Sequence, residues 1–181
     1  MAVKALKQLI FDADWGELDY LIIDTPPGTG DVHLSIVQSL PLTGAVVVTT
    51  PQPVALADAK KAVAMLKMDN IKVPVLGLVE NMSWFTPKNY PEEKYFIFGE
   101  DGGENLAKSL SIKLLGKVPL VESIRQSGDV GRPAVLQQET KVEKYYNDLC
   151  DKLILNIEER NAKLEPTKVV GVEYGDPKCS T

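Results

Sequence analysis

The chain of 181 residues is long enough for one domain or slightly more, and its 44% hydrophobic and 25% charged residues are typical of a soluble globular protein. A net charge of -5 without a basic segment argues against a nucleic-acid-binding surface, and no apolar run is long enough to span a membrane. The two cysteines, Cys150 and Cys179, are too few for a disulfide framework, so we expect a protein of the reducing cytoplasm.

The first predicted element is a strand at residues 18–23, because a short continuous apolar run is typical of a strand that is buried on both faces. A short helix is expected at residues 33–40. The β-branched, apolar segment 44–50 predicts a second buried strand. Apolar residues at helical spacing then predict a helix over residues 53–70, and Pro74 follows its end.

The alternation of strands and helices continues through the second half of the chain. The predicted elements are, in order, a strand at residues 73–79, a helix at 102–110, a strand at 113–117 and a helix from Thr140 to about Arg160. The last helix has one apolar face, made of Val142, Tyr146, Leu149, Leu153 and Ile157. Residues 161–181 are expected to form a loosely packed tail with a short strand at 168–172.

Alternating strands and helices predict an α/β fold with a mainly parallel sheet flanked by helices. In such sheets, ligands bind at the carboxyl ends of the strands. The residues at those ends are Asp24, Pro51, Asn81 and Pro119. We therefore expect the functional site at this edge of the sheet.

Asp24 ends the first predicted strand and is followed by a segment rich in proline and glycine, "DTPPGTGD". A carboxylate at the rim of a sheet suits Mg²⁺ beside a nucleoside triphosphate, since Mg²⁺ takes hard oxygen ligands and keeps several waters. Gly28 and Gly30 would let backbone N–H groups approach the phosphate oxygens. The alternative is that Asp24 begins a turn that the prolines and glycines shape.

Five ordered segments carry a resemblance to a known family. They are "LDYLIIDTPPGTGDVHLSIVQ", "TTPQPVALADAKKA", "VLGLVENMSWF", "FGEDGGENLA" and "GKVPLVESIRQSGDVGRPAV". Together they resemble the Mrp/ApbC family, the ATP-binding relatives of MinD and ParA among the P-loop NTPases. The resemblance implies that residues 1–160 form the C-terminal part of a MinD-like P-loop NTPase domain and that residues 161–181 form a tail.

The resemblance also implies a function and a set of site residues. Family members are cytoplasmic ATPases that use ATP and Mg²⁺, work as homodimers, and carry or scaffold iron–sulfur clusters for client proteins. By matched position, Asp24 would serve the metal, Gly28 the γ-phosphate and Asn81 the adenine, while Pro119 and Leu120 would lie against the base. Asn81 could instead cap a strand end, and Pro119 and Leu120 could be ordinary loop residues.

The chain lacks the phosphate-binding loop of the family, since no G-x-x-x-x-G-K-[ST] segment occurs in it. Met1 therefore resembles an internal methionine, and we expect the chain to be the C-terminal half of a longer protein. The family places the strand that precedes this loop between the strands at 18–23 and 44–50, which would here flank an empty slot with open apolar edges. Without the loop donors and their lysine, we predict that the chain alone does not hydrolyse ATP, whereas a full-length parent would.

The chain also lacks the C-x-x-C that follows the "ENMSxF" segment in most family members. The residues after Phe85 read T-P-K-N, which argues against an iron–sulfur cluster held at this position. Cys150 follows Leu149 on the last predicted helix and is interpreted as a core residue. Cys179 lies near the end of the chain and is interpreted as an exposed thiol.

Two other classes of function remain open. The first is a MinD- or ParA-like positioning ATPase, although the last helix is mixed in charge and is not a basic surface helix. The second is a non-catalytic interaction module that keeps the half-sheet as a scaffold. Arg125 either forms a solvated ion pair with Asp129 or faces the nucleotide or partner subunit. Six aromatic residues form either an interface or a small satellite core: Trp84, Phe85, Tyr90, Tyr95, Phe96 and Phe98.

Overall fold

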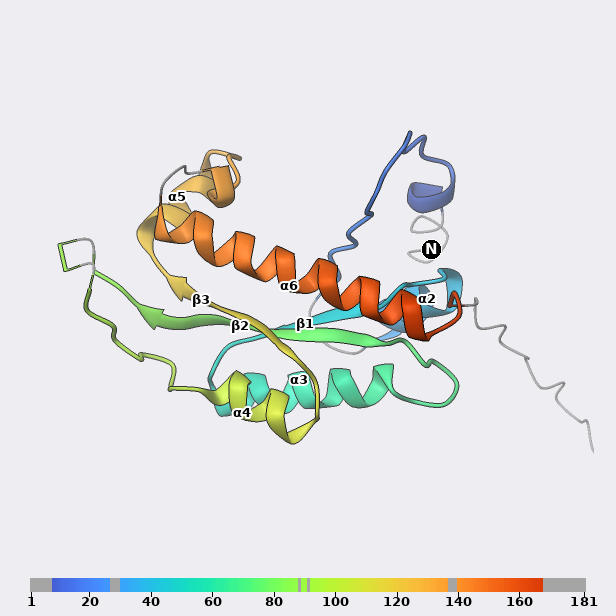
Figure 1. Cartoon of the computed structure of the whole chain (residues 1–181), viewed down its shortest axis with the longest axis horizontal. Coiled ribbons are helices and arrows are strands. Elements are labelled where there is room, and N and C mark those ends of the chain that lie inside the picture. Colours follow the sequence, from blue (N-terminus) through green and yellow to red (C-terminus); the bar gives the residue numbers. More distant parts are fainter. Residues whose placement is uncertain (1–7, 27–29, 88, 91, 137–139, 168–181) are drawn as a thin grey trace, which may run out of the picture.

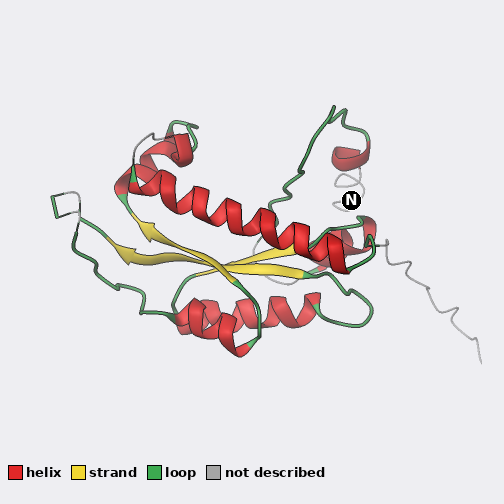
Figure 2. Cartoon of the chain, in the orientation of Figure 1, coloured by secondary structure: helices red, strands yellow, loops and turns green. Residues whose placement is uncertain are grey.

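The structure is a computed structural model that describes residues 8–26, 30–87, 89–90, 92–136 and 140–167. Its elements form three layers around a central sheet (Figures 1 and 2). Helices α3 (Pro53–Leu66) and α4 (Gly102–Ser109) cover one face, and the long helix α6 (Lys141–Lys163) crosses the other. This arrangement confirms the predicted α/β fold with a parallel sheet flanked by helices.

The sheet has three parallel strands, β1 (Ala45–Thr49), β2 (Val75–Phe85) and β3 (Leu114–Leu120), in the order β1, β2, β3. Strands that are covered on both faces read as continuous apolar runs, which is why the sequence predicted these three. β2 and β3 extend further than the predictions at 73–79 and 113–117. Their extra residues lie at the carboxyl ends, where polar residues and a proline interrupt the apolar pattern.

Apolar side chains pack against both faces of the sheet. Beneath α6, the buried residues Val79 and Leu115 contact Leu149 and Leu153. The cluster beneath α3 comprises Val37, Val47, Ala59, Val63, Leu66, Ile71 and Val73. These two clusters hold the strands in register and so fix the positions of the strand ends.

Helix α6 begins with a side-chain cap, because the hydroxyl of Thr140 accepts a hydrogen bond from the backbone N–H of Glu143 at 3.1 Å. The predicted inward face of this helix is confirmed: Tyr146, Leu149 and Leu153 pack on the sheet. The interpretation of Cys150 as a core residue is wrong, since its side chain is exposed. One residue after Leu149 corresponds to a rotation of about 100° around the helix, which turns Cys150 away from the sheet.

The predicted strand at residues 18–23 does not form. These residues have no regular secondary structure, and the side chain of Ile22 is 85% exposed. A strand requires a neighbour that pairs with its backbone N–H and C=O groups. Within the described part of the chain, β1 pairs with β2 alone, so no ladder reaches residues 18–23.

Two further differences concern the region after β3. Helix α5 (Glu122–Asp129) and a single 3-10 turn, η1 (Ala134–Leu136), occupy a stretch in which the sequence predicts no helix or strand. α5 is short, polar and contains Gly128, so its sequence has little helical signal. Its Arg125 forms an exposed ion pair with Asp129 one turn later, which confirms the solvated-pair interpretation. The helix predicted at 33–40 is α2 (Asp31–Ser39), and the tail strand predicted at 168–172 lies outside the described residues.

Candidate functional site

The carboxyl ends of the three strands meet at one edge of the sheet, as expected for parallel neighbours. Thr49 of β1 lies opposite Glu80 of β2, and Asn81 lies opposite Val118 of β3. Pro119 follows Val118 directly, and Leu120 pairs with Phe85. The structure therefore brings together Asn81, Pro119 and Leu120, three of the predicted site residues.

Asn81 marks an irregular point in β2. Its side-chain oxygen accepts a hydrogen bond from the backbone N–H of Met82 at 2.9 Å, and Met82 has a left-handed backbone with φ 54°. The hydroxyl of Ser83 donates to the carbonyl of Glu80 at 2.8 Å. The pairing with β3 shifts register between Asn81 and Phe85. Asn81 therefore bonds the backbone at an irregular point inside β2, before the strand ends at Phe85, and its half-buried amide keeps NH₂ donors for a ligand.

Glu80, the residue before Asn81 in β2, is a buried acidic residue that the sequence did not single out. Its side chain is 1% exposed, and its Oε2 accepts a hydrogen bond from the backbone N–H of Gly103 at 2.5 Å. Gly103 lies in the first turn of α4, where free N–H groups favour an anion. The sequence does contain a signal for this contact, namely an acidic residue inside an apolar strand. A carboxylate that is buried in this way needs hydrogen-bond partners.

The paired glycines at the start of α4 permit this contact. A Cβ atom on Gly102 would lie 2.5 Å from the backbone oxygen of Pro51, and one on Gly103 would lie 2.9 Å from Oε2 of Glu80. Both distances are shorter than real Cβ contacts. Glycine at these positions therefore lets the first turn of α4 lie directly against the ends of β1 and β2.

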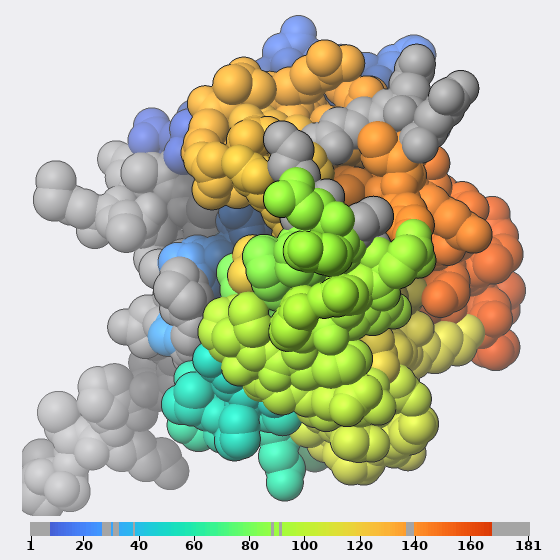
Figure 3. Space-filling model, turned by 90° about the vertical axis from the view of Figure 1, so that its left-hand side faces the viewer, coloured from blue at the N-terminus to red at the C-terminus, as the bar shows by residue number. Residues whose placement is uncertain are grey.

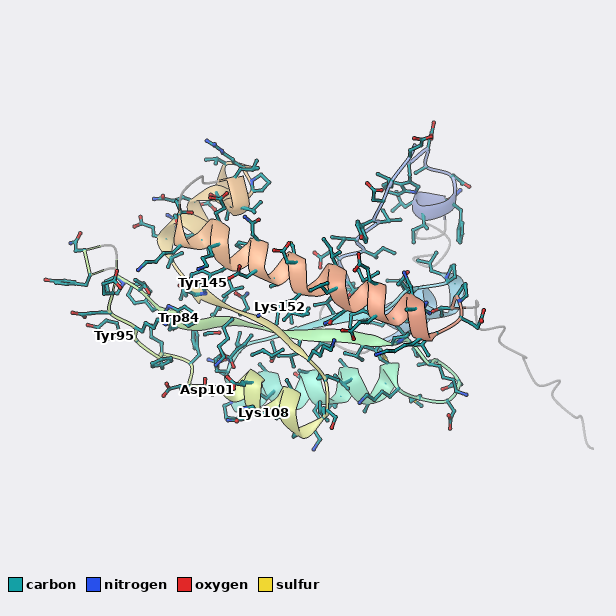
Figure 4. All side chains as sticks on the ribbon, in the orientation of Figure 1. Trp84, Tyr95, Asp101, Lys108, Tyr145 and Lys152 are labelled. Atoms are coloured by element: carbon teal, nitrogen blue, oxygen red, sulfur yellow. The ribbon has the colours of Figure 1, made fainter. Side chains whose placement is uncertain are left out.

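A cluster of ion pairs also connects α4 to β3. Lys117 of β3 forms ion pairs with Asp101 and with Glu104, the latter at 2.6 Å, and Lys108 reaches Glu104 at 2.7 Å. Hydrogen bonds from Lys108 and Lys117, with the charges of both, lower the pKa of Glu104 to about 2. Burial acts to lower the pKa of Lys117, but its bonds to Asp101 and Glu104 outweigh burial and raise it. Figure 4 shows Asp101 and Lys108 at the α4 side of the sheet.

A buried hydroxyl supports a polar ligand at this edge. Thr49 donates to the carbonyl of Thr50 at 3.2 Å, whereas Oγ1 of Thr50 is buried and has no hydrogen-bond partner among the described residues. A buried polar atom without a partner costs free energy that a ligand or water would recover. The base end of the expected nucleotide therefore fits the residues present.

Asp24 does not lie at a strand end, because residues 18–23 form no strand. Its side chain is exposed, and the neighbouring Thr25 is tied to α2 by a contact of 3.2 Å between its Oγ1 and Nε2 of His33. Gly28 lies outside the described residues. The metal role of Asp24 and the phosphate role of Gly28 stay predictions.

The aromatic segment has a packed part around Trp84 and an exposed part, and its interpretation as an interface stays a prediction. Trp84 is 7% exposed and packs edge-to-face on Tyr145 of α6, with ring centroids 5.7 Å apart. Figure 4 labels both side chains, which lie between the sheet and α6. Nζ of Lys94 lies 4.2 Å from the centroid of the Trp84 ring, a cation–π contact. Phe85 and Tyr95 form an antiparallel bridge. Tyr90, Tyr95 and Phe96 are exposed, as is the neighbouring Ile97. The segment that contains them is the green region at the centre of Figure 3.

No group of three or more His, Cys, Asp or Glu side chains in the described ranges is arranged to hold a metal ion. Among the helices that the structure describes, none combines the length and the apolar character needed to cross a bilayer.

Relatives of the chain in sequence include proteins named as iron–sulfur cluster carrier or transfer proteins. The chain is 49% identical over 133 residues to the iron-sulfur cluster carrier protein of Synechocystis sp.. The matched region covers 74% of this chain and 37% of the relative. The chain is also 50% identical over 139 residues to the iron-sulfur cluster transfer protein NUBPL of Mus musculus. That matched region covers 76% of this chain and 42% of the relative. The chain thus matches less than half the length of these two relatives.

Solved structures show the same fold. The nucleotide-binding protein in complex with ADP from Archaeoglobus fulgidus superposes with a TM-score of 0.67 at 35% identity, covering 80% of this chain and 57% of that one. The cell division ATPase MinD of Pyrococcus furiosus superposes with a TM-score of 0.59 at 23% identity, covering 84% and 56%, and shows the fold alone. A family model described as "ParA: NUBPL iron-transfer P-loop NTPase" matches residues 1–154. The chain therefore belongs to the ParA family of P-loop NTPases, in its NUBPL iron-transfer group.

Proposed function

We propose that the chain is part of an iron–sulfur cluster carrier of the Mrp type that binds a nucleotide at the carboxyl edge of its sheet. The observation that carries this proposal is the meeting of Asn81, Pro119 and Leu120 beside the unpartnered hydroxyl of Thr50. Support comes from the 35%-identical relative, which is a nucleotide-binding protein in complex with ADP. The carrier role is supported by relatives named for iron–sulfur cluster transfer.

In this proposal, Asn81 hydrogen-bonds the adenine, and Pro119 and Leu120 border the base. Asp24 serves Mg²⁺, and Gly28 contacts the γ-phosphate. Mg²⁺ neutralises phosphate charge when it is bound. For Asp24 to reach the phosphates, residues 18–23 need a neighbouring strand that places them in the sheet.

We also propose which part of the full-length protein this chain forms and which steps it carries out. Residues 1–160 form the C-terminal part of the NTPase domain, and residues 161–181 form a tail. The chain binds nucleotide but does not turn it over, because its sequence has no G-x-x-x-x-G-K-[ST] loop. The full-length protein works as a cytoplasmic homodimer and hydrolyses ATP. It carries an iron–sulfur cluster as cargo for client proteins. Without a C-x-x-C after Phe85, this segment is not proposed to hold the cluster.

Equilibrium dialysis tests the proposed site. The full chain is dialysed against MgADP and MgATP, with Asn81→Ala as the site variant and Asn147→Ala, an exposed asparagine on α6, as the matched control. Loss of an amide that contacts the base should weaken binding by about 1–3 kcal/mol, or roughly 5- to 150-fold, in Asn81→Ala alone. Equal binding by Asn81→Ala and the wild type would exclude Asn81 from the site, and no binding by the wild type would favour the interaction module.

A further inference from the structure

Residues 8–26 form an arm that stands away from the sheet, drawn in blue in Figure 1. Within the arm, residues 18–23 have the apolar pattern of a strand, in which alternate side chains share one face. One of these faces is wholly apolar and exposed, and consists of Leu18, Tyr20 and Ile22. In the described part of the chain, no backbone–backbone hydrogen bond joins residues 18–23 to any other residue. The arm therefore carries a strand-like segment whose backbone has no partner strand.

The sheet has the complementary feature at β1. Among the described residues β1 pairs with β2 alone, so its other edge presents unpaired N–H and C=O groups. Helix α6 contacts β2 and β3 but leaves Val48 of β1 61% exposed, although its neighbours Val47 and Thr49 are buried. An exposed β-branched side chain beside an open strand edge is a surface on which a further strand packs.

Contacts at both ends of the arm direct it away from its own β1. Oγ1 of Thr25, two residues after the strand-like segment, lies 3.2 Å from Nε2 of His33 on α2. Nε1 of Trp15 donates to the carbonyl of Ile10 at 2.9 Å, which folds the tip of the arm onto itself. One chain thus holds residues 18–23 and the edge of β1 apart, and each is open to the matching element of a second copy.

We propose that two copies of this chain exchange their arms, so that residues 18–23 of each copy pair with β1 of the other. The exchange is symmetric and closed, because each copy provides one arm and one edge and neither is left over. Ile22 then lies beside the partner subunit's Val48, and both side chains leave water. Below the dissociation constant of this dimer, the chain is the single copy described above.

The exchange also bears on the proposed nucleotide site, and this consequence alone rests on the proposed function. A strand that pairs in parallel with β1 ends at the carboxyl edge of the same sheet. Asp24 follows residues 18–23 directly, so the exchange brings it to the edge at which Asn81 of the other copy lies. Each copy would then supply the carboxylate for Mg²⁺ to the site of the other.

Sedimentation equilibrium of the full chain over a range of concentrations tests the exchange without any ligand. The wild type is expected to reach twice its chain mass of 19.9 kDa and no more. Val48→Lys places a charge beside the open edge and is expected to raise the dissociation constant of the dimer about tenfold or more. Val130→Lys, at an equally exposed valine that ends α5, is the matched control and is expected to leave the constant unchanged.

A second substitution separates lost pairing from a damaged fold. Adding Ile22→Glu to Val48→Lys places opposite charges side by side in the exchanged pair, and is expected to restore dimer formation. The proposal is overturned by a wild type that stays monomeric at every concentration or forms assemblies larger than two copies. Equal weakening by Val130→Lys, or no recovery in the double variant, would overturn it as well.

Disulfide formation identifies the contact directly. Two chains are prepared in a Cys150→Ser, Cys179→Ser background, one with Ile22→Cys and the other with Val48→Cys. When mixed and oxidised, the two different chains are expected to form a disulfide with each other, because neighbouring strands bring Cα atoms within disulfide range. Disulfides between two Ile22→Cys chains alone would overturn the exchange. So would a chain with both substitutions that closes its disulfide as a monomer, because the arm would then dock on its own β1.

The role of Asp24 is tested by equilibrium dialysis of ADP with and without Mg²⁺. Mg²⁺ is expected to tighten ADP binding by the wild-type dimer, but not by Val48→Lys at a concentration at which that variant is monomeric. Mg²⁺ that tightens binding in both, or in neither, rejects the supply of Asp24 by the partner copy. Failure of ADP to bind at all rejects the proposed nucleotide site, and the exchange is then decided by sedimentation and disulfide formation.

Discussion

The carboxylate of Glu80 accepts a hydrogen bond from the backbone N–H of Gly103 at 2.5 Å, and this contact joins the central strand to the first turn of α4. Water barely reaches Glu80, so the interaction takes place in a medium of low polarity. A carboxylate near the N-terminus of a helix is stabilised by free N–H groups and by the helix dipole. Glu80 therefore sets where α4 begins relative to the carboxyl edge of the sheet.

Removing the Glu80 carboxylate is expected to destabilise the chain. Glu80→Ala leaves the buried N–H of Gly103 without its acceptor, which costs about 1–3 kcal/mol, and Glu80→Gln, which keeps an oxygen acceptor, costs about half of that. Urea unfolding checks this as a lower midpoint at an unchanged slope. Glu158→Gln, at an exposed position on α6, is the control. A Glu80→Ala variant as stable as the control would contradict the role of this contact.

Alanine at the glycines that start α4 is expected to be costly. The new Cβ would lie 2.5 Å from the backbone oxygen of Pro51 in Gly102→Ala and 2.9 Å from Oε2 of Glu80 in Gly103→Ala. Overpacking of this kind costs about 1–3 kcal/mol, and more at Gly102, because backbone yields less than a side chain. The matched control is Gly128→Ala in α5, where a Cβ would meet nothing within 4 Å. That change is expected to stabilise by about 0.5–1 kcal/mol in thermal unfolding, since alanine favours helix. Destabilisation by all three substitutions alike would refute the steric explanation.

Acid is expected to weaken the charge cluster between β3 and α4. The pKa of Glu104 is about 2 in the folded chain against an ordinary 4.5, so the folded state favours the ionised carboxylate. This stabilisation is fully present above about pH 4.5 and is lost as the pH falls through about 2. Thermal midpoints of wild type and Glu104→Gln are therefore expected to differ at neutral pH and to converge near pH 2, with a small difference because solvent reaches the carboxyl in part. A difference in thermal midpoint that stays constant between neutral pH and pH 2 would show that the ion pairs of Glu104 are not its source.

The exposed position of Cys150 leads to a chemical prediction. In a Cys179→Ser background, Cys150 is expected to react with a thiol reagent in the folded chain within about tenfold of its rate in the unfolded chain. Cys150→Ser is expected to change the free energy of unfolding by no more than about 0.5 kcal/mol. Protection of Cys150 by several orders of magnitude would instead restore its interpretation as a core residue.

The sequence predicted the elements whose stability depends on their own apolar pattern. β1, α3 and α6 fall within a few residues of their predicted ranges, because each has a face or a run that a local window reveals. The strand at 18–23 has an equally clear pattern, yet it fails because a strand also needs a partner, which a local window does not supply.

The candidate site was predictable only in part. Asn81 and Pro119 were found because residues that follow apolar strands gather at one edge of a parallel sheet. The contact between Glu80 and Gly103 was not, since it joins residues 23 positions apart and depends on how α4 docks. The left-handed backbone at Met82 was also missed, because methionine gives no local signal for it.

The failure of residues 18–23 to join the sheet has a calorimetric consequence. Ile22 is 85% exposed and Val48 of β1 is 61% exposed, so these side chains already contact water before the chain unfolds. Apolar surface that is hydrated in the native state adds nothing to the heat-capacity increment of unfolding. The increment per residue is therefore expected to fall below the roughly 12–15 cal/mol/K of typical globular proteins, which gives a flatter dependence of stability on temperature.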